Sequence, residues 1–353
     1  MIDILLYLLI GTYTSNQSEG FYMYNFNTED AKVQYISEAK VDNPSFLTVS
    51  ASGNFIYSVS ENSDESSAVH AYSFDKEKNE IHLINKQNTN GVAPCYITID
   101  KNRTHAITAN YGSGNISVFA ITEDGGLSPE SQTIQFEGSS INKERQNEPH
   151  LHCVQFSPDG RFLFANDLGT DRIYKFKVNP NNSKNYLQQK KKETIDLKPG
   201  SGPRHLTFHP NGKLAYLINE LSGTIECFHY DTKKGKLDAF QTVLADEYQA
   251  EGSGDIHISP NGDFLYASLR VKNDGIAIYS IDEVTGELQR VGYQNTGTHP
   301  RNFTISPSGD HLLVACRDTN KVEIYEVDKE TGLLTPTNKA IELSNPVFVT
   351  FFK

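Results

Sequence analysis

The chain has 353 residues, enough for two average domains or one large all-β domain, so length alone does not decide between them. Its formal net charge of −12 argues against nucleic acid or an anionic membrane surface as the main partner, because both attract basic surfaces. Four widely spaced cysteines without a CxxC pair indicate buried reduced thiols rather than a disulfide framework or a zinc site: Cys95, Cys153, Cys227 and Cys316.

The first apolar stretch, Ile4–Ile10, reads ILLYLLI and follows Asp3. It is too short to cross a bilayer. Because no basic segment precedes it, it is also a poor signal peptide. We therefore predict a buried strand here and a cytoplasmic protein, with export as the alternative.

A repeated sequence pattern with a period of about 50 residues predicts the fold. Each copy has an apolar alternation, a turn such as Pro-Asn-Gly and a second alternation, which together signal a β-hairpin. The central turn position of the six copies is Gly53, Arg103, Gly160, Gly212, Gly262 and Gly309. A proline introduces most copies: Pro44, Pro94, Pro149, Pro203 and Pro300.

Further strand patterns follow the copies, at residues 115–121, 172–178, 224–230, 276–281 and 321–327, each with a turn and one more strand behind it. Four strands in each period of this length are typical of a β-propeller blade. A seventh copy begins at Asn345 and the chain then stops, whereas the N-terminus offers three strands at residues 5–12, 21–27 and 33–41. We predict an all-β, seven-bladed β-propeller closed by one C-terminal and three N-terminal strands, forming a single domain over residues 1–353. Two stacked β-sandwiches, the alternative, would not explain the period.

Residues at the start of the first strand and at the end of the second strand of each blade are expected at one mouth of the central channel. Eight residues before the central turn position lie Ser45, Cys95, His152, Arg204, Gly254 and Arg301. Eight residues after it lie Glu61, Tyr111, Leu168, Glu220, Arg270 and Arg317. Neighbouring positions add His150, Asp167, His205, Asp255, His257 and His299.

Four arginines at one mouth of an acidic protein predict an anion-binding site, because the guanidinium fork suits carboxylate and phosphate. The alternative is that these arginines pair with Glu61, Glu220 or Asp167 and join the blades. His150 and His152 could ligate a metal, but no third ligand has a recognisable spacing. His209 and His311 are expected at the opposite end of the blades, exposed and without a role.

Several strings resemble the lactonase family of seven-bladed propellers, which contains the propeller-type 6-phosphogluconolactonases and the fungal carboxy-muconate lactonizing enzymes. They are GTYTS at residues 11–15, PHLHCVQFSPDGRFLFANDLGTDRIYKF at 149–176 and GPRHLTFHPNGKLAYLINEL at 202–221. The resemblance covers essentially the whole chain. It implies catalytic roles for His152, Arg204, Glu220 and Arg270, with His150 as the alternative histidine. Arg270 lies in SLRVKND, where the family usually has an SNR-like string.

The expected function is therefore hydrolysis of a phosphorylated or carboxylated sugar lactone, most simply as a 6-phosphogluconolactonase. A muconate-type cycloisomerase and a non-enzymatic binding propeller are the alternatives. Either His152 or Glu220 could act as the base. The small anionic substrate would contact His150, Asp167, His205, Arg301 and Arg317. No metal or organic cofactor is expected, nor a nucleic-acid or membrane partner, and the oligomeric state stays open.

Overall fold

A computed structural model describes residues 5–189 and 193–353 of the protein. Within these residues the strands form seven antiparallel sheets, six of four strands and one of five. The chain forms two compact units. The first unit consists of Met1–Glu38, His205–Asp231 and Lys236–Lys353, and the second of Ala39–Arg204 and Thr232–Gly235. The expectation of a single domain over residues 1–353 stays a prediction.

Three sheets belong to the second unit. The first consists of β4 (Leu47–Val49), β5 (Phe55–Ser60), β6 (Ala68–Asp75) and β7 (Glu80–Asn88). The next consists of β8 (Pro94–Ile99), β9 (His105–Asn110), β10 (Asn115–Ile121) and β11 (Leu127–Gln135). The third consists of β12 (Leu151–Phe156), β13 (Phe162–Asp167), β14 (Arg172–Val178), β15 (Leu187–Gln188) and β16 (Thr194–Asp196), with a short 3₁₀ helix at Ser183–Asn185.

Four sheets belong mainly to the first unit. One consists of β17 (Pro203–Phe208), β18 (Leu214–Asn219), β19 (Thr224–Asp231) and β20 (Lys236–Leu244). The next two consist of β21 (Ser253–Ile258), β22 (Phe264–Leu269), β23 (Gly275–Ile281) and β24 (Leu288–Asn295), and of β25 (Pro300–Ile305), β26 (His311–Cys316), β27 (Lys321–Val327) and β28 (Leu334–Glu342). The last consists of β1 (Leu5–Thr12), β2 (Gly20–Asn27), β3 (Val33–Lys40) and β29 (Pro346–Phe352).

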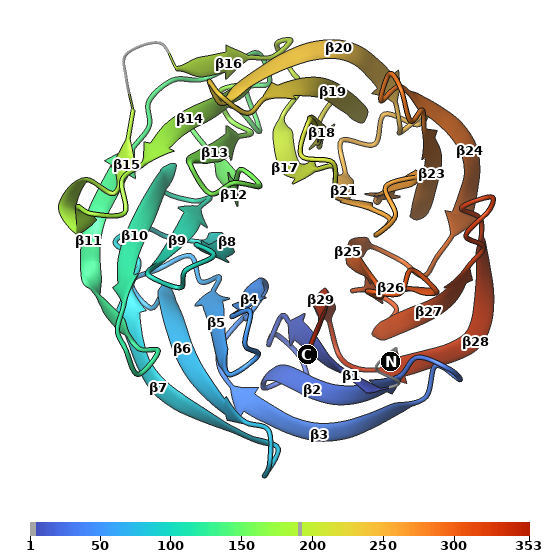
Figure 1. The fold of residues 1–353 in the computed structure, drawn as a ribbon, viewed down its shortest axis with the longest axis horizontal. Coiled ribbons are helices and arrows are strands. Elements are labelled where there is room, and N and C mark those ends of the chain that lie inside the picture. The colour runs from blue at the N-terminus through green and yellow to red at the C-terminus, as the bar shows by residue number, and fades with distance from the viewer. Residues whose placement is uncertain (1–4, 190–192) are drawn as a thin grey trace. The chain divides into compact units, whose positions relative to one another are not determined.

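The two ends of the chain share this last sheet, whose strand order is β29-β1-β2-β3. Figure 1 shows β29 beside β1, and Ile10 of β1 lies opposite Val349 of β29 and Tyr22 of β2. Leu8, Leu9 and Ile10 have no exposed surface, because a central apolar strand buries both of its faces. The predicted N-terminal strand and the predicted combination of terminal strands are thus confirmed, except at Ile4, which lies outside the described residues.

The hairpin turn of the repeat requires a left-handed backbone conformation at its central position. Gly53 and Gly212 have φ values of 73° and 67°, which glycine adopts without steric cost. Arg103 takes the same conformation with φ of 55°, at a cost of roughly 1 kcal/mol or more for a residue with a Cβ. Its guanidinium lies 4.3 Å from the centre of the Phe55 ring, and this cation–π contact offsets part of the cost.

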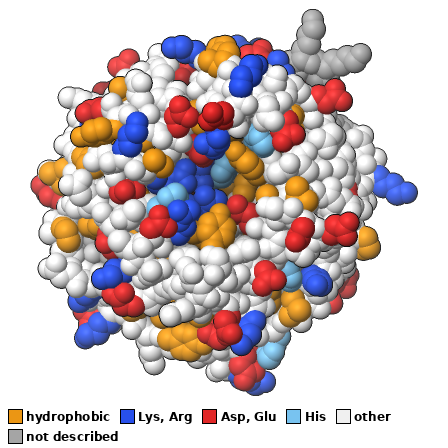
Figure 2. Space-filling model, turned by 180° about the vertical axis from the view of Figure 1, so that it is seen from behind, with side chains coloured by type: hydrophobic (Ala, Val, Ile, Leu, Met, Phe, Trp, Pro, Cys, Tyr) orange, Lys and Arg blue, Asp and Glu red, His pale blue; other side chains and the backbone are white. Residues whose placement is uncertain are grey.

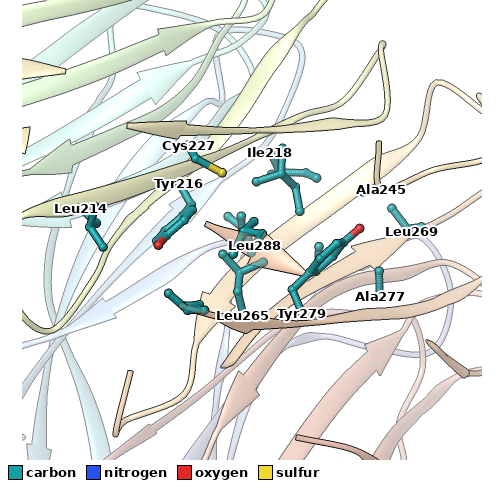
Figure 3. Packing of buried hydrophobic residues seen from close by; sticks show 14 residues of the cluster. Leu214, Tyr216, Ile218, Cys227, Ala245, Leu265, Leu269, Ala277, Tyr279 and Leu288 are labelled. Atoms are coloured by element: carbon teal, nitrogen blue, oxygen red, sulfur yellow. The ribbon is translucent and has the colours of Figure 1, made fainter. Parts of the chain in front are cut away.

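The core between adjacent sheets consists of buried apolar side chains from both sheets, as Figure 3 shows for β17–β20 and β21–β24. Tyr216 of β18 is fully buried in this cluster, and its hydroxyl donates to the carbonyl of Gly286 in the neighbouring sheet at 2.8 Å. Tyr57 and Tyr266 stand at the same place in their own copies and make equivalent bonds to Gly125 and Gly332. This recurring bond satisfies a buried hydroxyl while it fixes the spacing of the sheets.

The prediction that His311 is exposed is wrong. Only 5% of this residue is exposed, and its ring packs edge-on against Phe26 at 5.4 Å, because the side chain points into the space between two sheets. His209 is partly exposed, and its Nε2 lies 2.9 Å from the carbonyl of Gly262.

All four cysteines are free and buried, as expected. Among the described residues, no helix is long and apolar enough to cross a membrane.

Candidate functional site

A recurring backbone bond brings together the two ends of four of the six predicted hairpins. In these four, the residue eight positions after the central turn position donates its N–H to the carbonyl of the residue ten positions before that turn position. This bond joins Glu61 to Asn43, Tyr111 to Ala93, Leu168 to His150, and Arg317 to His299, at 2.9–3.1 Å. Within these sheets the start of the first strand and the end of the second therefore lie side by side, which confirms this part of the prediction.

A β-bulge marks the start of the first strand in several sheets. The strand pairing skips Cys95, His152 and Arg301, each eight residues before its central turn position. A bulge redirects a side chain and is common beside active sites. The sheet with β21 has Gly254 at this position, because a Cβ there would lie 2.4 Å from Ser268 Oγ. The sequence pattern gave no sign of these bulges.

The four residues with predicted catalytic roles divide between the units: His152 and Arg204 belong to the second, and Glu220 and Arg270 to the first. In the second unit, His150 and His152 both contact Tyr111. The ring of His150 stacks on the ring of Tyr111 at 4.4 Å, and His152 meets it edge-on at 5.6 Å. His150 Nδ1 lies 2.9 Å from the carbonyl of Tyr111. Because a carbonyl only accepts, Nδ1 carries the proton and Nε2 is the basic nitrogen of the neutral ring.

Asp167 fixes the backbone around His150. Its Oδ1 accepts from the N–H of His150 at 2.7 Å and from that of Gly169 at 3.0 Å, and its Oδ2 accepts from Thr170 Oγ1 at 2.7 Å. The carboxyl is fully buried, and burial raises its pKa although these hydrogen bonds act in the opposite direction. In this structure Asp167 positions the loop that carries His150.

Arg204 and His152 are both nearly inaccessible, with 2% and 5% of the residue exposed. Asn166 Nδ2 donates to the backbone carbonyl of Arg204 at 3.1 Å, which fixes the main chain at the start of β17. A buried guanidinium is costly unless it is paired. Its placement here therefore points to a specific role, whether structural or in binding.

In the first unit, Arg270 is the centre of a polar group at the end of β22. Its Nε donates to the carbonyl of Gly252 at 2.7 Å and its Nη2 donates to the carbonyl of Ser253 at 3.0 Å. Nη2 also lies 3.4 Å from Glu220 Oε2. Side-chain exposure is 5% for Arg270 and 9% for Glu220, so this ion pair is shielded from solvent and screened little by salt.

Another donor group of Arg270, Nη1, contacts His299, to which the sequence analysis gave no role. Arg270 Nη1 lies 3.3 Å from His299 Nε2. Burial and the positive charges of Arg270, Arg317 and Arg301 together lower the pKa of His299 to about 3, whereas the charge of Asp318 opposes the shift. His299 is therefore neutral at physiological pH. One signal could have marked it: it lies ten residues before its central turn position, as His150 does in its own copy.

The other two candidate arginines of this unit, Arg301 and Arg317, have different surroundings. Arg317 makes two bonds to Asp318, at 2.6 and 3.0 Å, and 31% of its side chain is exposed. The guanidinium of Arg301 lies 5.3 Å from the centre of the Tyr13 ring. On the face drawn in Figure 2, Lys, Arg and His side chains gather in one area while acidic side chains are scattered.

His205 belongs to a separate buried network around Asp255. Asp255 accepts from His205 Nδ1 at 2.6 Å and from His257 Nε2 at 2.8 Å, and it also contacts Asn302 Nδ2. Asn302 Oδ1 in turn accepts from the N–H of Val349 at 2.7 Å. The charges of the two histidines hold the pKa of Asp255 well below its usual range against the effect of burial. The network links β17, β21, β25 and β29. In residues 5–189 and 193–353, no group of three or more His, Cys, Asp and Glu side chains could hold a metal ion.

Comparison with known proteins agrees with this architecture. The family model described as "Lactonase, 7-bladed beta-propeller" matches residues 7–351. The 6-phosphogluconolactonase of Formosa agariphila is 39% identical over 332 residues, 93% of this chain and 94% of the relative. A crystal structure from Bacteroides fragilis is 52% identical, with a TM-score of 0.97 over 99% of both chains. The periplasmic gluconolactonase of Pseudomonas aeruginosa is 30% identical, with a TM-score of 0.93 over 99% of both chains.

The family match and the seven sheets confirm the predicted fold class, an all-β, seven-bladed β-propeller. The resemblance stated from the sequence strings is confirmed as well. The chain belongs to the lactonase family of seven-bladed β-propellers.

Proposed function

We propose that this protein is a lactonase that hydrolyses 6-phosphogluconolactone, a small phosphorylated sugar lactone. The observation that carries the proposal is the group of three arginines in the first unit, Arg270, Arg301 and Arg317, whose positive charges all act on the single imidazole of His299. Such a concentration of guanidinium groups favours an anionic ligand. The name of the Formosa agariphila relative supports the lactone and its phosphate.

The reaction needs three contributions from the protein. A base takes a proton from water as the water oxygen attacks the ring carbonyl carbon. A donor stabilises the negative charge that develops on the carbonyl oxygen. The bond to the ring oxygen then breaks, and that oxygen takes up a proton to become the hydroxyl group of the open-chain acid. We assign the donor role to Arg270, because its guanidinium is held by acceptors and does not need to reorganise during the reaction.

We propose His152 as the base in preference to Glu220. The ion pair with Arg270 favours the ionised form of Glu220 and reduces its tendency to take up a proton. Imidazole, with a reference pKa of about 6.5, is suited to proton transfer near neutrality. Arg204 is proposed to hold substrate charge, together with His150, Arg301 and Arg317 as further substrate-binding residues. The substrate contacts expected of Asp167 and His205 stay predictions, because both side chains lie in buried hydrogen-bond networks.

The test is hydrolysis of freshly generated 6-phosphogluconolactone, measured as the excess over the spontaneous rate in the same buffer. Unphosphorylated gluconolactone and a carboxy-muconate are the parallel substrates. Preference for gluconolactone would match the name of the Pseudomonas aeruginosa relative. It would contradict the proposal that the substrate carries a phosphate. Turnover of the muconate alone would favour a cycloisomerase, and no turnover of any substrate would contradict enzymatic function. A cytoplasmic location stays a prediction that fractionation of cells can check.

A further inference from the structure

We propose that His299 is a positioning residue, which holds the guanidinium of Arg270 in place by accepting a hydrogen bond at Nε2. The inference rests on the proposed function, since Arg270 is the residue whose placement would matter for the lactone. His299 itself need not touch the substrate.

The contacts of Arg270 show what His299 contributes. Backbone carbonyls of Gly252 and Ser253 accept from Nε and Nη2, which lie along one edge of the planar guanidinium, and Glu220 lies near Nη2 as well. Nη1 lies on the other branch of the fork, and His299 Nε2 lies 3.3 Å from it. Loss of this acceptor would weaken the hold on the Nη1 branch, so that the guanidinium plane could tilt about the edge that Nε and Nη2 form.

His299 is suited to this contact because its ring is neutral. Nε2 accepts a hydrogen bond only when it carries no proton, so Nδ1 bears the proton. Nδ1 faces Asp318 Oδ2 at 3.8 Å, which favours that tautomer. Protonation of the ring would place a further positive charge beside Arg270, Arg301 and Arg317, and these charges act against it.

The backbone also holds the ring in place. Asp274 Oδ1 accepts from the N–H of His299 at 2.9 Å, and the carbonyl of His299 accepts from the N–H of Arg317 at 3.1 Å. His299 has φ of 60°, a conformation that is costly for most residues. The other copies have small or polar residues, or a second histidine, at this position: Asn43, Ala93, His150, Gly202 and Gly252. His299 keeps an imidazole at this strained position and uses it to contact Arg270. This indicates that the contact requires the imidazole side chain.

Two variants of similar shape test the inference. His299→Gln keeps an acceptor oxygen near the position of Nε2, whereas His299→Met has nearly the same length and flexibility but only a weakly accepting thioether sulfur. Both bring the same backbone cost at positive φ. We expect kcat/KM of His299→Met on the lactone to fall about 10- to 100-fold, because small misplacements of catalytic groups have effects of this size. His299→Gln should stay within about threefold of wild type, with thermal stability matched between the two variants.

Crystal structures of both variants supply a readout that does not depend on turnover. Arg270 should keep its position in His299→Gln and shift in His299→Met. An unmoved guanidinium in His299→Met, or an equal loss of activity in both variants, would overturn the inference even if wild-type lactonase activity is found. If the wild-type protein hydrolyses no lactone and Arg270 nevertheless shifts only in His299→Met, the proposed function fails while the positioning role stands.

Discussion

The pairs Tyr111–His150 and Arg270–His299 occupy the same two positions of the repeat, one in each unit. In both, the histidine lies ten residues before its central turn position and contacts the last residue of the preceding hairpin. The ring of His150 stacks on an aromatic ring, and its Nδ1 donates to a carbonyl. The ring of His299 instead accepts a hydrogen bond from a guanidinium. The repeat thus determines where each imidazole lies, and its neighbour determines what it can do.

The difference has a direct chemical consequence. His150 donates a hydrogen bond from Nδ1, which leaves Nε2 as its acceptor. His299 lies among three arginines that disfavour its protonated form, so it can serve only as a neutral acceptor at physiological pH. Equivalent positions in a repeat protein therefore need not have equivalent functions.

The largest expected effect concerns the base. His152→Ala should lower kcat about 10²- to 10⁴-fold on the lactone, the usual contribution of a general base, and Glu220→Gln should lower it less. Steady-state kinetics above the spontaneous rate measure both. Glu61→Gln, at the position of Glu220 in another sheet, is the control and should leave turnover unchanged. If Glu220→Gln has the larger effect, the base is Glu220.

Arg270→Lys should lower kcat/KM about 10- to 100-fold. Lysine keeps the positive charge but cannot reproduce the planar fork that contacts Gly252, Ser253 and His299 at once. The control is Arg290→Lys, because Arg290 lies on β24 and bonds to Glu247 with 30% of its side chain exposed. Equal activity of Arg270→Lys and wild type would show that charge alone is needed there.

The neutral state of His299 should appear in the pH dependence of stability. Its pKa is lowered from 6.5 to about 3 in the folded protein, so the unfolded chain takes up a proton below pH 6.5 that the folded chain excludes. The contribution is complete above pH 6.5 and is lost as the pH falls towards 3. Between pH 7 and pH 5, denaturant unfolding of wild type should lose about 1–2 kcal/mol more than that of His299→Gln. Parallel pH profiles would contradict the low pKa.

The smallest expected effect concerns the aromatic pair. Tyr111→Leu should lower the free energy of unfolding by about 0.5–1.5 kcal/mol, the usual value of an aromatic pair, because the stacking on His150 is lost. Tyr111→Phe keeps the ring and should stay close to wild type. Denaturant midpoints of the three proteins measure the difference. A Tyr111→Phe variant as unstable as Tyr111→Leu would show that the hydroxyl, rather than the ring, stabilises the pair.

The local pattern of the sequence determined the fold in detail. The period of the repeat predicted four strands in each copy, which six sheets have, whereas the sheet of β12–β16 has five. The unmatched strand patterns at the two ends predicted the sheet of β29 with β1, β2 and β3. Strand alternation and turn residues are local signals that survive in any context. The failure at His311 arose because burial depends on the neighbouring sheet, here on Phe26, which the local pattern does not contain.

The choice of candidate residues also came from the sequence, because spacing from the central turn position collected Arg270 and Glu220 and placed His299 among their neighbours. Only the tertiary structure decided their partners: Arg270 bonds to two carbonyls and to His299, Arg317 to Asp318, and His205 to Asp255. Apart from Asp318, which follows Arg317 directly, those partners come from other segments of the chain, and bulges that leave no mark in the sequence redirect side chains such as His152. Charge and hydrogen bonding depend on distances of a few ångströms between such strands, so the role of each residue followed from packing rather than from position in the repeat.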